Sequence, residues 1–226
     1  MERRRLRIQL TGPSGMGKTT LAMDLARHLG IEFSSGSYSD LMPETRKMTH
    51  REMLELSPET KFQNDYQLLN LRNKLWNGKS TYVSDRSFMD SAAYMVNKVS
   101  QTIPECDLDS FVGACKTCLT HCEAVIFLTY PDKIHDWSIE DNHKRILNGY
   151  YQMQISQIIW GLLRDMDWHF ISNEDGGIYS TIQIGDYVIP VCIVKTTDYR
   201  ERLRLVGGFL HKFDLLTNTD TLFSLD

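Results

Sequence analysis

The stretch that decides the fold lies near the start of the sequence, where an apolar segment runs into a glycine-rich loop: Leu6-Arg7-Ile8-Gln9-Leu10-Thr11, then Gly12-Pro13-Ser14-Gly15-Met16-Gly17-Lys18-Thr19-Thr20. The loop fits G-x-x-x-x-G-K-[ST] at every specified position. The apolar residues before it predict a β-strand over residues 6–10. Leucines recur four residues apart over Lys18–Leu29, which predicts a helix that Gly30 ends. A strand before such a loop and a helix after it are the context that a phosphate-binding loop requires.

The residue types in this loop point to a bound nucleoside triphosphate. Glycines let backbone N–H groups turn toward a phosphate, and the helix that follows presents its positive N-terminus to the same anion. Lys18 is expected to neutralise charge between the β- and γ-phosphates of ATP, and Thr19 to bind Mg²⁺. Thr20 is a further hydroxyl within reach of the α-phosphate. We therefore expect Gly12–Thr20 to bind ATP with Mg²⁺, although the motif alone does not separate kinases, GTPases and motor proteins.

Composition describes an ordinary folded protein. The 226 residues include 25 Lys and Arg against 29 Asp and Glu, a net charge of −4, which argues against a general polyanion binder. Hydrophobic residues make up 42% and charged residues 24%, which excludes wholesale disorder. No apolar run approaches the ~18 residues of a membrane span. Five cysteines and no secretory segment favour a reducing, cytoplasmic location.

Strand and helix patterns alternate along the rest of the chain. Further strands are expected at Ile31–Ser34, Thr81–Ser84, Ala124–Leu128 and Trp168–Ile171, and further helices at Glu59–Trp76, Phe88–Val99, Leu108–Cys122, Ile146–Leu163 and Asp198–Leu210. This alternation predicts an α/β fold, with a parallel sheet covered by helices on both faces. No linker or repeat divides residues 1–226, so one domain is expected. A β-hairpin at about residues 174–195 would be added to its C-terminal part.

Two charged segments favour a kinase. Asp85 and Arg86 follow the Thr81–Ser84 strand, where the acid can serve Mg²⁺ or accept a proton from an attacking hydroxyl, and the arginine can grip a phosphate. The alternative is that the pair only caps the next helix. His143-Lys144-Arg145 lies where a basic lid would close over the phosphates, with Arg145 as its leading residue; a solvated helix start is the alternative. Neither the paired acids of motor ATPases nor the base-reading motif of GTPases is present.

Three segments together, Gly12–Thr20, Asp85–Tyr94 and Tyr130–Arg145, resemble the P-loop nucleoside and nucleotide kinases of the thymidylate-kinase-like group. The chain is most similar to the ribosylnicotinamide-kinase-like AAA proteins of phages and bacteria. The resemblance implies a three-layer fold with a five-stranded parallel sheet and a lid over residues 130–145. It implies transfer of the γ-phosphate to a nucleoside, a nucleotide or a modified base in DNA, such as 5-hydroxymethyluracil, in a bacterial or phage-infected cell, and it allows a homodimer. Asp85 departs from the glutamate usual in deoxynucleoside kinases.

Position along the chain gives a first set of acceptor-binding candidates: Tyr38, Arg46, Gln63, Tyr66 and Gln67. A nucleotide-dependent regulatory switch that phosphorylates no small acceptor is the competing function. Cys115, Cys118 and Cys122, with His121 beside them, suggest zinc by type. Their spacing of three and four instead continues an apolar helix face, so we expect these thiols to pack in the core.

Overall fold

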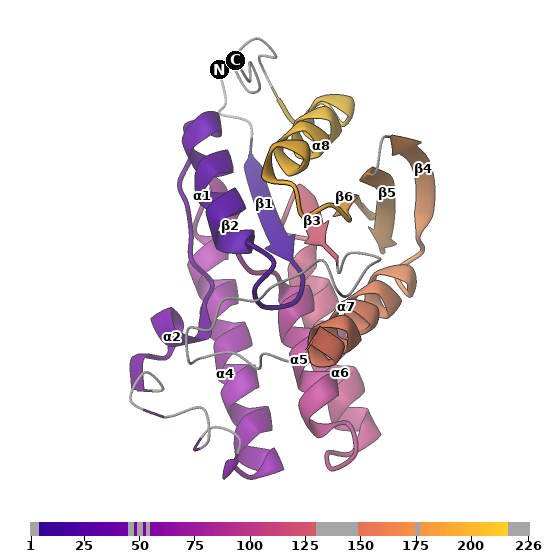
Figure 1. Ribbon diagram of the computed structural model, residues 1–226. Helices are drawn as coiled ribbons and strands as arrows, with labels where there is room; N and C mark the ends of the chain where they lie inside the picture. Colours follow the sequence, from indigo (N-terminus) through magenta and orange to yellow (C-terminus); the bar gives the residue numbers. More distant parts are fainter. Residues whose placement is uncertain are drawn as a thin grey trace.

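One mixed β-sheet forms the centre of the molecule (Figure 1). The computed structural model describes residues 5–44, 48, 52, 55–129, 149–174 and 177–216. Its six strands lie in the order β2-β1-β3-β6-β5-β4. They are β1 (Leu6–Thr11), β2 (Thr81–Ser84), β3 (Ala124–Leu128), β4 (His169–Glu174), β5 (Gly177–Ile184) and β6 (Tyr187–Val194). The first four strands of this order are parallel, and β5 and β4 continue the sheet antiparallel.

Helices cover both faces of the sheet, which confirms the predicted α/β class. They are α1 (Lys18–Leu29), α2 (Tyr38–Leu41), α4 (Pro58–Asn77), α5 (Phe88–Val99), α6 (Glu105–Leu119), α7 (Gly149–Arg164) and α8 (Tyr199–Lys212). Side chains of β3 alternate between the two faces, as a strand requires. Ile126 packs into the apolar cluster of α1 and α8. Phe127 packs into the cluster of α4, α5, α6 and α7. The predicted bounds of α1, α5, β2 and β3 are confirmed residue for residue.

The hairpin at residues 177–194 lies inside the sheet, whereas the prediction placed it outside a five-stranded sheet. It is no addition to the fold, because β6 pairs parallel with β3, in register from Val125 and Val191 onward. The strand expected at Trp168–Ile171 forms β4 instead, at the sheet edge beyond β5. A parallel strand inside a sheet is buried on both faces. Residues 191–194 are fully buried, whereas Phe170 is 62% exposed, so burial selects β6 for the inner position.

The strand expected at Ile31–Ser34 is reduced to one parallel bridge, between Phe33 and Val83. Two backbone hydrogen bonds flank it, from Val83 N–H to Glu32 and from Ser34 N–H to Val83, each 2.9 Å long. Beyond Ser34 the chain leaves the edge of β2 and turns toward the loop after that strand, where Gly36 contacts Asp85. The interaction with Asp85 therefore replaces further strand pairing.

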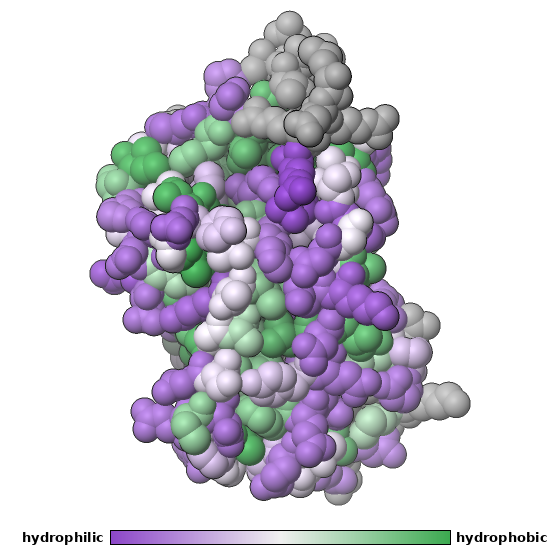
Figure 2. All heavy atoms as spheres, turned by 180° about the vertical axis from the view of Figure 1, so that it is seen from behind, coloured by the Kyte–Doolittle hydropathy of each residue, from purple (hydrophilic) through white to green (hydrophobic). Residues whose placement is uncertain are grey.

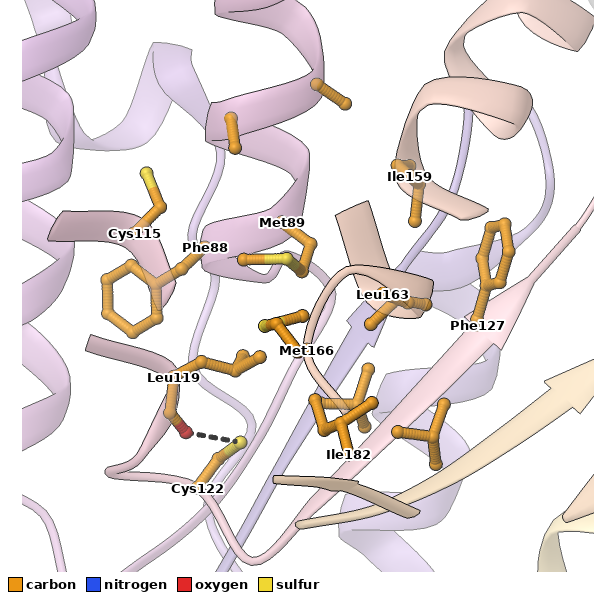
Figure 3. Packing of buried hydrophobic residues seen from close by; sticks show 14 of the residues in the cluster. Phe88, Met89, Cys115, Leu119, Cys122, Phe127, Ile159, Leu163, Met166 and Ile182 are labelled. Atoms are coloured by element: carbon orange, nitrogen blue, oxygen red, sulfur yellow. Dashed lines mark hydrogen bonds between the residues drawn. The ribbon is translucent and has the colours of Figure 1, made fainter. Parts of the chain in front are cut away.

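Cys115 in α6 and Cys122 just after it lie in the core, as the spacing predicted. Cys115 and Cys122 are 0% and 5% exposed, and Figure 3 shows them among the apolar side chains of the α5, α6 and α7 layer. Cys122 Sγ donates a hydrogen bond to the carbonyl oxygen of Leu119 at 3.1 Å. Burial raises the pKa of both thiols, so they stay neutral. Half-buried Cys118 packs against the same cluster.

Polar and apolar side chains are mixed on the face seen in Figure 2. Hydrophilic residues cover most of it, and hydrophobic ones occur in small groups between them. Across the described part of the chain, none of the helices combines the length and the apolar character that crossing a bilayer would need.

Candidate functional site: a phosphate loop with a flanking carboxylate

The phosphate loop, Gly12–Thr20, joins β1 to α1 at the end of the sheet where the parallel strands finish. Gly12 has φ of +140°, and a Cβ atom there would lie 2.2 Å from the carbonyl oxygen of Leu128, at the end of β3. Only glycine allows so close an approach of the loop to the neighbouring strand. Gly15 and Gly17 also have positive φ, at 85° and 77°. The three glycines thus fix the loop shape that the motif predicted.

The N-terminus of α1 is arranged to receive an anion. Gly17 precedes the helix, no side chain caps it, and the first turn contains no acidic residue. Its first N–H groups and the helix dipole therefore favour a negative ligand. Lys18, 3% exposed, donates hydrogen bonds from Nζ to the carbonyl oxygens of Gly12 at 2.5 Å and Pro13 at 2.7 Å. The ammonium group is thus held against the loop that would enclose a phosphate.

Asp85 links the phosphate loop to the end of β2. The Thr19 hydroxyl donates a hydrogen bond to Asp85 Oδ2 at 2.7 Å, and the Gly36 N–H donates to Oδ1 at 3.3 Å. The carboxylate is 3% exposed. Hydroxyl and carboxylate oxygens are the ligands that Mg²⁺ prefers in proteins. Their contact beside the anion-binding helix end fits the metal expected with a nucleotide.

Arg86 takes no part in the N-terminal cap of α5, which Ser87 forms with Asp90. Ser87 caps α5: its Oγ accepts from the Met89 N–H at 3.2 Å, and Asp90 Oδ2 accepts from the Ser87 N–H at 2.7 Å. The cap is thus built without Asp85 or Arg86, contrary to the alternative that these two only cap the helix. Arg86 is half-buried, and its Nη1 donates to the Asp85 carbonyl oxygen at 3.3 Å.

Asp90 and Tyr94, which the sequence did not single out as site residues, join α5 to the phosphate loop by hydrogen bonds. Asp90 Oδ1 accepts from the Gly12 N–H at 3.2 Å, so one carboxylate joins the loop to the helix cap. The Tyr94 hydroxyl accepts from the Ser14 N–H at 3.1 Å and lies 2.8 Å from Ser14 Oγ. A Ser followed three residues later by an acid is a capping-box pattern, and Ser87-x-x-Asp90 could have been found by it.

Arg72 of α4 holds the segment that contacts Asp85. Its Nε and Nη2 both donate to the Gly36 carbonyl oxygen, at 2.8 and 2.6 Å, and Nη1 donates to Ser91 Oγ at 2.5 Å. Burial lowers the pKa of Arg72 to about 10, so it remains a cation at neutral pH. Gly36 therefore connects this arginine, which bonds to its carbonyl oxygen, to the Asp85 carboxylate, which accepts from its N–H.

Gly36→Ala should impair this connection. A Cβ atom at Gly36 would lie 2.6 Å from Trp76 Cζ2 and 2.9 Å from Arg86 Cβ, so the segment must shift. Overpacking of this kind costs about 1–3 kcal/mol. We expect a lower thermal midpoint and a lower turnover. Gly78→Ala is the matched control, because nothing lies within 4 Å of a Cβ there. Equal stability and activity in the two variants would contradict the proposed contact.

Arg202 of α8 also holds the phosphate loop. α8 lies on the face of the sheet opposite to α4, which carries Arg72. Arg202 Nη1 donates to the Met16 carbonyl oxygen at 2.5 Å, and its Nε donates to the Thr196 carbonyl oxygen at 2.8 Å. Arg202 is 6% exposed. It thus joins the loop to the segment after β6, an arrangement that no sequence motif announces.

Arg202→Met should weaken nucleotide binding. The change keeps much of the side-chain bulk but leaves two carbonyl oxygens without their charged donor, which costs about 1.5–3 kcal/mol per charged hydrogen bond. A looser loop is expected to raise the KM for ATP about tenfold or more, the fold change that 1.4 kcal/mol represents. Arg204→Met, on the exposed face of the same helix where Arg204 pairs with Glu201, is the control. An unchanged KM in Arg202→Met would contradict the assignment.

The predicted acceptor residues are only partly brought to this site. Tyr38 is half-buried, and burial followed by the nearby Asp65 raises its pKa to about 12. Gln63 lies nine positions, or two and a half helical turns, before Arg72, and so lies on the opposite side of α4. It lines a surface hollow of about 490 Å³ together with Tyr66, Gln67 and Lys74. The candidates Gln63, Tyr66 and Gln67 therefore do not face the phosphate loop.

Several other expectations fall on residues outside the described ones. Arg46 and the expected lid at residues 130–145, including Arg145, belong to this group. The chain is described again from Gly149, where α7 begins.

Comparison with known proteins agrees with this architecture. Deoxyadenosine kinase from M. mycoides with bound dCTP is similar to the chain, with a TM-score of 0.60 and 14% identity, over 92% of this chain and all of that one. NadR protein in complex with NAD and AMP-PNP has a TM-score of 0.58 and 12% identity, and the match covers 95% of this chain and 51% of NadR. Such identities establish the fold alone. No curated protein sequence matches the chain.

A family model gives a more direct assignment. The model described as an AAA domain, AAA_28, matches residues 7–178. The match starts within β1 and includes the phosphate loop and Asp85. The chain therefore belongs to the AAA_28 family of AAA domains.

Proposed function

We propose that this protein is an ATP-dependent phosphotransferase that moves the γ-phosphate to a hydroxyl or phosphate of a nucleoside-type or nucleotide-type acceptor. The observation that carries the proposal is the 2.7 Å contact between Thr19 and Asp85 beside the anion-binding start of α1. The contact supports the proposal because it brings a buried carboxylate beside the helix N-terminus where a triphosphate would bind. Phosphate transfer depends mainly on positioning and charge stabilisation, and such a site supplies both.

Each residue of the site has a role in this proposal. Gly12–Thr20 would wrap the phosphates, with Lys18 against the β- and γ-phosphates. Thr19 and Asp85 would hold Mg²⁺, which neutralises phosphate charge when bound. Arg86 would grip the acceptor side of the transferred group. Arg145, in the lid, would stabilise charge as it spreads in the transition state.

The proposal allows three classes of acceptor. A free nucleoside, a nucleoside monophosphate and 5-hydroxymethyluracil within DNA all offer an oxygen that can attack the γ-phosphate. The similar fold of a deoxyadenosine kinase supports the first class. Residues 1–7 contain four arginines, Arg3, Arg4, Arg5 and Arg7, and this positive charge supports the third class, which is a polyanion.

An acceptor screen tests the proposal. Purified protein is supplied with ATP and Mg²⁺, and ADP release is measured with each nucleoside, each monophosphate and hydroxymethylated DNA. We expect at least one acceptor to raise ADP release well above the rate without acceptor. ADP release that no acceptor increases would instead favour the regulatory switch.

A further inference from the structure

A buried carboxylate lies beside the site without a full set of hydrogen bonds. Asp65 of α4 is 5% exposed. Among the described residues, its carboxylate accepts one hydrogen bond, from Lys98 Nζ at 3.4 Å. A carboxylate offers about four lone-pair positions, and an ionised one is costly to bury unless hydrogen bonds satisfy it.

The pair with Lys98 is weak, and the buried Arg72 guanidinium is a second positive charge that interacts with Asp65 without a hydrogen bond to it. The side chain of Lys98 is 36% exposed, whereas that of Asp65 is 7% exposed, and their separation is long. A buried ion pair stabilises a fold only when its geometry is good and further hydrogen bonds complete it. Asp65 Oδ1 receives no such bond from the residues that the structure describes, and it is not among their side-chain atoms that are both closed off from solvent and without a partner. Its remaining acceptor capacity suits a donor from another molecule.

The surroundings of Asp65 belong to the proposed acceptor region. Asp65 raises the pKa of Tyr38 in α2 and of Tyr151 in α7, in each case as a smaller cause than burial. Tyr94, which bonds to the phosphate loop through Ser14, also raises the pKa of Tyr151. Lys98 Nζ, which donates to Asp65, also lies 6.0 Å from the centre of the Tyr94 ring. Asp65 is thus linked through α5 to the tyrosine that bonds to the phosphate loop.

Distance along α4 relates Asp65 to the reacting end of the site. Asp65 and Arg72 are seven positions apart, two helical turns, and both are buried on the same side of the helix. At 1.5 Å per residue this separation is about 10 Å along the axis. Arg72 bonds to the carbonyl oxygen of Gly36, whose N–H bonds to Asp85, so Arg72 marks the end of α4 nearest the proposed reacting groups. A nucleoside has a length close to this spacing.

On this basis, which rests on the proposed function, we propose that Asp65 determines acceptor specificity by accepting a hydrogen bond from an exocyclic amino group on the base of a nucleoside acceptor. The sugar hydroxyl then lies toward Asp85 and Arg72, and the base lies between Tyr38 and Tyr151. A carboxylate accepts hydrogen bonds and donates none, so it distinguishes an amino group from a carbonyl at the same ring position. Phosphate or carbonyl groups at that end are disfavoured.

Matched acceptor pairs test the assignment in the unaltered protein. Cytidine and uridine differ at one position by amino against carbonyl, as do adenosine and inosine, and the deoxynucleosides offer the same comparison. For at least one pair we expect kcat/KM to favour the amino compound about 10- to 100-fold, the range expected for a hydrogen bond to a charged group. Equal kcat/KM for both members of every pair that is phosphorylated would overturn the proposal.

Asp65→Asn provides the second test. Asparagine has nearly the same shape but presents an amide donor, so the preference should fall by about tenfold or more, toward the carbonyl-bearing member. The ratio of two kcat/KM values does not depend on the fraction of folded enzyme, so partial misfolding cannot imitate this result. Asp109→Asn, at an exposed position of α6, should keep the original ratio. An unchanged ratio in Asp65→Asn would also overturn the proposal.

The phosphotransferase function and the role of Asp65 would be refuted by different results. If no nucleoside, nucleotide or modified DNA is phosphorylated, the phosphotransferase assignment itself is wrong. If only hydroxymethylated DNA or only monophosphates are phosphorylated, the enzyme assignment stands and the role of Asp65 is refuted.

Discussion

Replacing Lys18 by alanine is expected to lower phosphate transfer about 10³-fold, in the range seen when a transition-state charge contact is removed. Lys18 Nζ lies against the carbonyl oxygens of Gly12 and Pro13 in the loop that would enclose the phosphates. Alanine removes the cation that would offset charge between the β- and γ-phosphates. ADP release with the best acceptor measures the loss.

Lys74→Ala is the matched control for this change, because Lys74 is exposed on α4 and faces the surface hollow. Thermal denaturation should show that Lys18→Ala remains folded, with a loss of about 1–3 kcal/mol for the two carbonyl oxygens that lose a donor. A folded Lys18→Ala variant with transfer within tenfold of the original protein would contradict the role of this lysine.

Asp85→Asn should lower transfer about 10²- to 10³-fold while the fold is kept. The carboxylate accepts from Thr19 on one oxygen and from Gly36 on the other. An amide can accept on only one side and turns a donor toward the other partner, and it carries no charge for Mg²⁺. Turnover measured over a series of Mg²⁺ concentrations should therefore show both a lower maximum and a higher Mg²⁺ requirement.

Asp165→Asn serves as the control for Asp85→Asn. Asp165 has a side chain that is 72% exposed and pairs with Lys116 on the surface, so its change should leave turnover and Mg²⁺ requirement as they were. Near-normal transfer by Asp85→Asn at low Mg²⁺ would remove Asp85 from its proposed role.

The elements nearest the phosphate loop could be predicted because their signals are local. The loop pattern needs only the residues from Gly12 to Thr19, and the leucine spacing of α1 needs one helix. β3 is a short apolar run, buried at all five positions. Such signals do not depend on how distant segments meet.

Strand order could not be read in the same way. Both β4 and β6 contain apolar residues, and only the assembled sheet decides which one lies beside β3. The run Val188–Val194 was visible as an apolar segment of strand length, and its burial on both faces from Val191 onward agrees with an inner position. Phe170 and Ile171 suit an edge, because both are exposed there.

The residues around the proposed acceptor region were missed for a different reason. Asp65 and Arg72 share the buried stripe of α4 with Leu68, Leu69 and Trp76. Charged residues on an apolar helix face are a recognisable signal, because buried charges need partners. The prediction instead followed Gln63 and Gln67, polar residues that are exposed on the other side of the helix. Arg202 lies far along the chain from the loop that it holds, so only the structure relates the two.

This site is proposed to transfer phosphate to an acceptor. Mass spectrometry of the products from ATP, Mg²⁺ and the acceptor screen tests it most directly. We expect an acceptor that gains one phosphoryl group, in an amount equal to the ADP formed, and no such product with Lys18→Ala. ADP and inorganic phosphate formed in equal amounts, with every acceptor recovered unchanged, would contradict it.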